Sequence, residues 1–165
     1  VRSVDPKGLE TVFIYNSVGE THTGLYVDNP SDSPRIYDPG GSYAYPQETY
    51  YGTTTLIPPG SGDLFSDEQA NLQKYINYQM QDNGTIYLLR FDTTAKEEAK
   101  LAESMRLDGG RSGGFCATGV SNVLGTIDRF KKLSQPFFIR KPETLYEYLL
   151  GFKPSKIQQR IKNPT

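Results

Sequence analysis

The sequence has one cysteine, one histidine and no tryptophan among 165 residues. A single thiol cannot form an intramolecular disulfide, and it cannot supply the several cysteine ligands of a structural zinc site. A single histidine cannot replace the missing cysteine ligands. We therefore expect neither a disulfide framework nor a metal, and no pattern in the sequence indicates a cofactor.

Strong charge of one sign and long apolar runs are also missing. Eighteen basic residues stand against 19 acidic ones, which leaves a formal net charge of −1. This balance gives no electrostatic attraction to nucleic acid, so we expect no nucleic-acid partner. No apolar stretch approaches the roughly 20 residues of a membrane-spanning helix. Residues 1–10 do not have the pattern of a signal peptide, and the length favours a single domain.

The distribution of apolar and turn-forming residues predicts an α+β domain. β-branched and aromatic runs predict strands at 11–16, 21–28, 35–38, 85–92 and 137–139. Helical spacing after capping residues predicts helices at 66–81, 94–107, 115–127 and 142–150. A capping box from Ser66 to Gln69 opens the first of them, and another from Thr94 to Glu97 opens the second. The first two strands are expected to form an antiparallel hairpin, and the tail after Lys153 is expected to fray.

Residues 42–63 are rich in Gly, Pro, Thr and Tyr without periodicity, which predicts a long irregular loop. Tyrosines gather in and just before this loop, at Tyr37, Tyr43, Tyr45, Tyr50 and Tyr51. Two interpretations fit them. The rings pack the loop with their hydroxyls at the surface, or they form an aromatic wall beside a substrate groove.

The only cysteine lies in the stretch GRSGGFCATGVSNVLG, residues 110–125. Residues 108–114 predict a flexible loop, and the apolar stripe that follows Cys116 predicts a helix. A thiol at a helix N-terminus is favoured as the thiolate, and the Cys116 N–H could stabilise an oxyanion there. The alternative is a buried structural cysteine, and this stretch alone does not separate the two.

His22 opens the predicted strand HTGLYV. A cysteine nucleophile needs a base, and His22 is the only imidazole in the chain. A third group should orient that base. Asp38 is the best candidate because it ends the neighbouring predicted strand RIYD, whereas Asp28 lies farther along the His22 strand and faces away. Ser42 and Tyr43 are alternatives for the same role.

The blocks HTGLYV…RIYDPGGSY and GGFCATGVSNVL resemble the papain-like cysteine hydrolases of the NlpC group. Because histidine precedes cysteine, the order is similar to that of the circularly permuted branch, which includes lecithin:retinol acyltransferase-like proteins. The resemblance implies a small antiparallel sheet packed against the cysteine-bearing helix and further helices. It implies acyl transfer through a thioester on a phospholipid ester, slightly favoured by the permuted order, or on a peptidoglycan peptide amide. The implied catalytic residues are Cys116, His22 and Asp38, and the implied substrate contacts are Gly114, Tyr37, Tyr43 and Ser42.

The segment VDPKGL resembles the DPxGL motif that closes the core of Rhs-repeat proteins, although its residues also suit a plain β-turn. The resemblance implies self-cleavage between Leu9 and Glu10. It divides the chain into the end of an Rhs core at 1–9, a papain-like toxin domain at 10–152 and a basic polar tail at 153–165. It also implies contact-dependent delivery into a target bacterial cell. The implied partners are the parent Rhs cage with its secretion apparatus and a cognate immunity protein.

Other functions stay open at this point. A protease or deamidase acting on a target-cell protein would use the same thiol and the same base. A non-catalytic binding module would keep the papain-like fold and would not need the thiol. A toxin that acts on nucleic acid is disfavoured by the charge balance.

Overall fold

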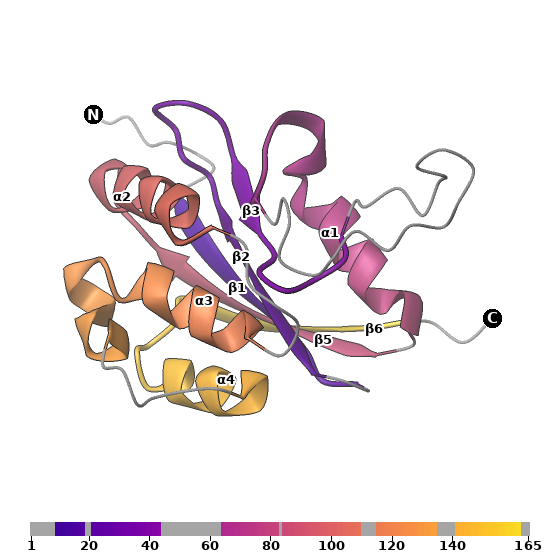
Figure 1. Cartoon of the computed structure of the whole chain (residues 1–165). Helices are drawn as coiled ribbons and strands as arrows, with labels where there is room; N and C mark the ends of the chain where they lie inside the picture. Colours follow the sequence, from indigo (N-terminus) through magenta and orange to yellow (C-terminus); the bar gives the residue numbers. More distant parts are fainter. Residues whose placement is uncertain are drawn as a thin grey trace.

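The computed structural model describes residues 9–18, 21–43, 64–82, 84–109, 115–134 and 141–162. These residues form a mixed α+β fold in which a small antiparallel sheet lies between helices (Figure 1). The predicted α+β class and the antiparallel sheet are thereby confirmed. The predicted strand at 137–139 and most of the predicted loop at 42–63 lie outside the described residues.

Within the described residues the strands follow the order β4-β3-β2-β1-β5-β6 across the sheet. Their bounds are β1 Glu10–Asn16, β2 His22–Val27, β3 Arg35–Tyr37, β4 Leu64–Phe65, β5 Thr85–Asp92 and β6 Lys156–Ile161. The α-helices are α1 Leu72–Gln79, α2 Ala95–Asp108, α3 Cys116–Leu124 and α4 Pro142–Leu150. Three short 3₁₀ helices are η1 Asp67–Gln69, η2 Met80–Asp82 and η3 Asp128–Ser134.

The predicted hairpin is present, with β1 and β2 paired from Thr11 opposite Val27 to Asn16 opposite His22. Strand β5 pairs with the other edge of β1 and lies inside the sheet, as its apolar sequence indicates. Alternate residues of these strands point to opposite faces, so each face acquires its own apolar surface.

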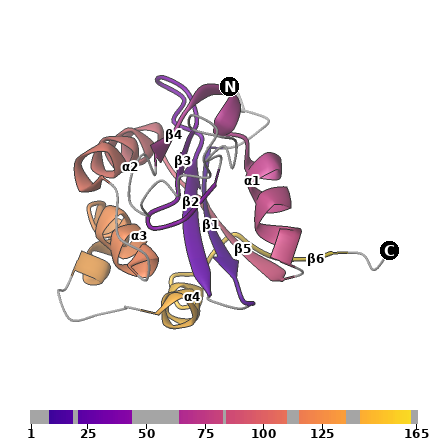
Figure 2. The same cartoon turned by 45° about the vertical axis from the view of Figure 1, so that its right-hand side comes forward.

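Helices cover both of these faces, and the strands lie between α1 on one side and α2 and α3 on the other (Figure 2). One apolar cluster joins the sheet to α2, α3, η3 and α4, and its residues from the sheet include Phe13, Leu25 and Leu89. A second cluster joins the opposite face to α1 and includes Val12 and Ile14. Helix α3 is buried along most of its length and packs against β2, α2, η3 and α4. The helix that begins with the cysteine is therefore fixed from several directions.

The predicted capping box at Ser66 is wrong. Ser66 makes no side-chain capping hydrogen bond, and only the short helix η1 follows it. Asp67 adopts a positive φ of 54°, and Ala70 leaves the helical region, so the turn cannot continue into a helix. Helix α1 instead begins at Leu72, where the Asn71 side chain accepts a hydrogen bond from the Lys74 N–H.

The expectation that the chain frays after Lys153 is also wrong for the described part of the tail. Residues of β6 pair with β5 from Arg90 opposite Lys156 to Thr85 opposite Ile161. The Ser155 N–H donates to the Arg90 carbonyl oxygen at 2.8 Å and starts this pairing. A polar strand can hold this position because an edge strand needs backbone partners on one side only. The sheet therefore extends into the 153–165 segment that the sequence interpretation set apart as a tail.

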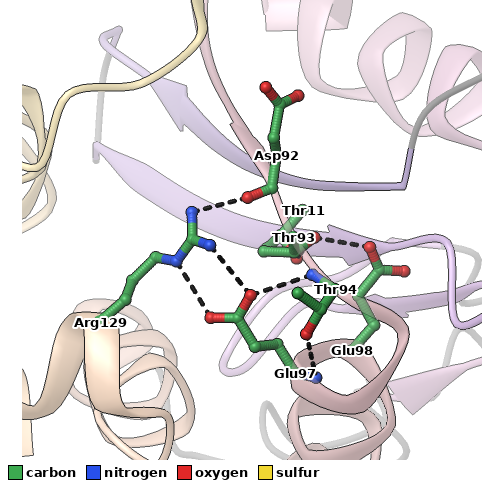
Figure 3. Close-up of polar contacts among 7 residues, drawn as sticks. All are labelled: Thr11, Asp92, Thr93, Thr94, Glu97, Glu98 and Arg129. Atoms are coloured by element: carbon green, nitrogen blue, oxygen red, sulfur yellow. Dashed lines mark hydrogen bonds and ion pairs between the residues drawn. The ribbon is translucent and has the colours of Figure 1, made fainter.

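The predicted capping box at Thr94 is confirmed and belongs to a polar cluster at the start of α2 (Figure 3). Thr94 and Glu97 exchange side-chain and backbone hydrogen bonds, and Glu97 also pairs with Arg129 of η3. The Arg129 guanidinium donates to the Asp92 carbonyl oxygen as well. This cluster ties the end of β5, the start of α2 and helix η3 together.

Glu98 is fully buried beside the same cluster, where it accepts a hydrogen bond from the Thr93 hydroxyl at 2.5 Å (Figure 3). It also accepts one from the Asn29 N–H at 2.8 Å. Burial raises the pKa of Glu98 to about 7, although these hydrogen bonds oppose the shift. The fold therefore favours the protonated form of Glu98. The contribution of this form to the free energy of unfolding is complete below the ordinary pKa of 4.5 and is lost as the pH rises through 7.

We expect Glu98→Gln to stabilise the chain at pH 8 by an amount on the order of 1–2 kcal/mol, because the glutamine never has to be buried as an anion. At pH 5 the variant should match the wild type. Urea denaturation at the two pH values measures this difference. Glu103→Gln, on the exposed side of α2, is the control: it removes only an exposed ion pair with Arg106, so it should change the stability little and by the same amount at both pH values. A variant that is less stable than the wild type at pH 8 would contradict the expected ionisation of Glu98.

Candidate active site

Cys116 is the first residue of α3, as the sequence predicts, and only 4% of its surface is exposed. Phe115 precedes it with non-helical backbone angles, and the Gly119 N–H donates to the Phe115 carbonyl oxygen to close the first turn. The N–H groups of a first helical turn have no acceptor within their own helix. The thiol therefore lies at the positive end of a helix that the core holds in place.

His22 and Asp38 are brought together from neighbouring strands. His22 is the first residue of β2, and Asp38 follows the last residue of β3, which pairs with β2. The His22 Nε2 nitrogen donates to Asp38 Oδ1 at 2.5 Å. Asp38 is 1% exposed and His22 is 16% exposed at the side chain, so water screens this contact weakly. The pairing expected from the sequence is present, and Asp28 takes no part in it.

The Cys116 thiol lies close enough to the His22 side chain for each of the two groups to shift the pKa of the other. Because Nε2 of the ring is occupied by Asp38, the Nδ1 nitrogen is the one available to the sulfur. The backbone of Thr23 and of Ala117 lies beside the sulfur as well and helps to lower the pKa of the thiol. Cys116, His22 and Asp38 thus form a continuous series that runs from α3 through β2 to the end of β3.

The electrostatics of this series favour a thiolate and an imidazolium. Burial alone would lower the pKa of His22, but Asp38 and Cys116 outweigh it and raise this pKa to about 10. Burial would raise the pKa of Cys116, yet His22 lowers it overall, with help from the two backbone segments beside the sulfur. The pKa of Asp38 is lowered despite its burial, because His22, Tyr75 and Tyr43 stabilise the carboxylate.

The other candidate residues take different positions. Tyr43 is buried, and its N–H donates to Asp38 Oδ2 at 3.1 Å, so it supports the aspartate instead of replacing it. Ser42 is exposed and its hydroxyl bonds to the Tyr78 hydroxyl. Tyr37 is fully buried and donates to Asp108 and to the Gly109 carbonyl oxygen.

The burial of Tyr37 and Tyr43 differs from the substrate-contacting positions that the sequence suggested. Both rings pack in the two apolar clusters on either face of the sheet. An aromatic ring with no exposed face cannot form the wall of a groove. Both rings therefore pack inside the protein, but their hydroxyls are hydrogen-bonded there and do not lie free at the surface as the packing interpretation expected. Gly114, Tyr45, Tyr50 and Tyr51 lie outside the described residues.

The sequence analysis missed two features of the site. The Tyr75 hydroxyl, from α1, donates to Asp38 Oδ1 at 2.5 Å. The Thr23 backbone helps to lower the pKa of the Cys116 thiol, and among the described residues its buried Oγ1 atom has no hydrogen-bond partner. Tyr75 could not be placed from the sequence because nothing local indicates that α1 packs over the end of β3. For Thr23, the position directly after His22 was the available signal.

The predicted cleavage point, Leu9 and Glu10, lies at the start of β1. The Leu9 carbonyl oxygen accepts a hydrogen bond from the Thr93 N–H at 3.1 Å, and the Glu10 N–H donates to Asp28 Oδ2 at 2.8 Å. Asp28 also accepts from the Tyr26 hydroxyl at 2.9 Å. The role of Asp28 is therefore to hold the first strand, away from the histidine.

The described residues contain no group of His, Cys, Asp and Glu side chains arranged to hold a metal ion, and none of their helices is long and apolar enough to cross a membrane. The chemistry available at the site is that of a nucleophile, a base and an orienting carboxylate. Comparisons with protein-family models, with curated proteins and with solved structures find no match to this chain.

Proposed function

We propose that this chain is a cysteine hydrolase or acyltransferase domain that acts through a thioester intermediate. The observation that carries the proposal is the continuous Cys116–His22–Asp38 series at the N-terminus of a buried helix. An activated thiol, a base in contact with it and a group that orients the base are the arrangement that nucleophilic catalysis requires. A papain-like fold of permuted order is proposed with it, supported by the cysteine helix packed against the histidine strand.

In the proposed reaction the Cys116 thiolate attacks a carbonyl carbon and forms a tetrahedral intermediate. The Cys116 N–H at the helix start would donate to the oxyanion. As the intermediate collapses, the His22 imidazolium gives its proton to the leaving alcohol or amine, and the acyl group stays on sulfur as a thioester. His22 then takes a proton from water or another acceptor, which attacks the thioester and releases the acyl product. Asp38 stabilises the imidazolium each time it forms.

The proposed role is that of an antibacterial toxin, with phospholipid acyl esters as the first substrate candidate and peptidoglycan peptide amides as the second. Delivery by an Rhs parent and neutralisation by an immunity protein are part of this proposal. The position of Glu10 supports the domain boundary: an α-ammonium group released by cleavage after Leu9 would stay beside Asp28 Oδ2, where the Glu10 nitrogen now lies at 2.8 Å. The cut would then add an ion pair at the start of β1 and leave the strand in place.

The proposal is tested by expressing the chain in the bacterial cytoplasm and, with an added export signal, in the periplasm. We expect growth arrest in one compartment, and loss of that arrest in Cys116→Ala and in His22→Ala. Asp32→Asn, which changes an exposed carboxylate in the turn before β3, is the control and should stay toxic. Lysophospholipid or free fatty acid in extracts of arrested cells would identify a lipase, and altered muropeptides an amidase.

Growth arrest that survives both substitutions would overturn the hydrolase proposal and favour a non-catalytic binding module. Arrest that depends on Cys116 but leaves lipids and muropeptides unchanged would point to a protease or deamidase. Mass spectrometry of the target-cell proteins would then show new termini or a conversion of glutamine to glutamate.

A further inference from the structure

The Asp38 carboxylate accepts hydrogen bonds from other residues besides His22, the histidine that it orients. Its Oδ1 atom accepts two hydrogen bonds, from His22 Nε2 and from the Tyr75 hydroxyl, each at 2.5 Å. Its Oδ2 atom accepts from the Tyr43 N–H at 3.1 Å. Three elements thus converge on one buried carboxylate: strand β2, helix α1 and the turn after β3.

Tyr75 reaches Asp38 through the space above Gly24. Residues 22 and 24 of β2 point to the same face of the strand because strand side chains alternate. A β-carbon at position 24 would overlap the Tyr75 hydroxyl and would stand 2.8 Å from its Cζ atom. Glycine at this position is therefore required if the phenol is to lie beside the histidine and contact the same carboxylate oxygen.

The ring of Tyr75 is fixed in this position. It is fully buried and packs edge-on against Tyr43, with ring centroids 4.9 Å apart. Tyr43 donates its own hydroxyl to the Gln69 carbonyl oxygen, so the two rings support each other. On the other side, a β-carbon at Gly41 would overlap the Asp38 carboxylate, which shows how closely the turn after β3 wraps it. These contacts restrict the rotation of the Asp38 carboxylate.

We infer that Tyr75 is a positioning residue of the proposed acyl-transfer reaction. Its hydroxyl fixes Asp38 in the orientation that holds His22 against Cys116, and Gly24 is the position that makes room for it. This inference rests on the proposed function, because it assigns a role within the same site. It adds a fourth side chain and a required glycine to the Cys116–His22–Asp38 series.

The phenol acts as a hydrogen-bond donor and does not exchange its proton. Burial and the neighbouring Asp38 charge hold the pKa of Tyr75 well above its ordinary value, so the hydroxyl stays neutral. The titratable side chains around it are Asp38 and Tyr43 from the turn after β3, His22 from β2, Cys116 from α3 and Tyr78 from α1. The effect of the Tyr75 hydroxyl on the site should therefore appear in the titration of the His22–Cys116 pair.

The test is the pH profile of alkylation of Cys116 by iodoacetamide, which reports one site because the chain has one thiol. In Tyr75→Phe the Asp38 carboxylate loses the donor that fixes its orientation, so it can turn away from His22 and the imidazolium loses part of its counter-charge. We expect the acid limb of the profile to move to higher pH and alkylation at pH 6 to be about tenfold slower than in the wild type. The rate at the alkaline plateau should change little.

Tyr26→Phe is the matched control. Tyr26 lies on β2 as well, and its hydroxyl also donates to an aspartate, Asp28, at 2.9 Å. The control profile should superimpose on the wild type. Gly24→Ala keeps the phenol but displaces its hydroxyl, so it should shift the acid limb in the same direction. The double variant Gly24→Ala/Tyr75→Phe should be shifted by less than the sum of the two single shifts.

A Tyr75→Phe profile that superimposes on the wild type would overturn the inference, and so would a uniform loss of rate without any shift. If Tyr75→Phe does not fold, as judged by circular dichroism, the shift in Gly24→Ala decides the question alone. The wild-type profile tests the proposed function separately. A rate that rises only near pH 9, the ordinary pKa of a thiol, would mean that Cys116 is not activated at all.

Discussion

Cys116→Ala is expected to abolish the burst of p-nitrophenolate that the wild-type chain releases from p-nitrophenyl acetate. The wild type should release one equivalent rapidly and gain the mass of one acetyl group, because the thiolate attacks the ester and retains the acyl group. Without the sulfur, we expect acylation to slow by at least about 10³-fold at pH 7. Stopped-flow absorbance measures the burst, and intact-protein mass spectrometry measures the acetyl group.

His22→Ala is the informative companion of this variant, because it keeps the thiol and removes its base. We expect its burst to be about 10²- to 10⁴-fold slower at pH 7 and to recover as the pH approaches 9, where an ordinary thiol ionises unaided. A burst that persists in Cys116→Ala would place acylation on another group and contradict the proposed nucleophile. Thermal melts of both variants show whether the fold is retained.

Asp38→Asn is expected to have the second large effect, on both activity and stability. The acylation rate should fall by about 10²- to 10⁴-fold, because the imidazolium loses its counter-charge and its fixed orientation. The pKa of His22 should fall from about 10 toward its ordinary 6.5 or below, since burial then acts without Asp38 to oppose it. The chain has one histidine, so NMR of the imidazole ring follows this titration without ambiguity.

The stability effect of Asp38→Asn has a defined pH window. A raised pKa at His22 contributes stability that is complete below pH 6.5 and is lost as the pH rises through about 10. A lowered pKa at Asp38 contributes stability that is complete above pH 3.8 and is lost below it. The wild type should therefore exceed the variant most between about pH 4 and 6.5, by about 2–4 kcal/mol, and urea denaturation measures this.

Asp28→Asn is the matched control for this prediction. It also removes the charge of an aspartate that accepts a tyrosine hydroxyl on β2, but its contacts are with Glu10 and Tyr26. The His22 titration and the acylation rate should be unchanged in this variant. An Asp38→Asn chain that titrates like the wild type would show that the carboxylate does not control the histidine.

Elements defined by local signals could be predicted from the sequence. The β1–β2 hairpin follows from alternating β-branched and aromatic residues, and α2 begins at the Thr94 capping box because Thr94 and Glu97 satisfy each other's backbone groups. The same reasoning failed at Ser66, where the residue pattern is present but the positive φ of Asp67 breaks the turn. Strand β6 was missed because its polar sequence has little burial, and its place is set by the open edge of β5.

The sequence alone determined which reactive groups the candidate site can contain. With one thiol and one imidazole, any cysteine chemistry must use Cys116 and His22, and the end of the strand beside His22 made Asp38 the leading partner. The tertiary structure decided what surrounds that carboxylate. Tyr75 lies 37 residues after Asp38 in the sequence, and the glycine that makes room for its hydroxyl is two residues from the histidine. Contacts of this kind depend on how elements pack across the sheet, and local patterns carry no information about that packing.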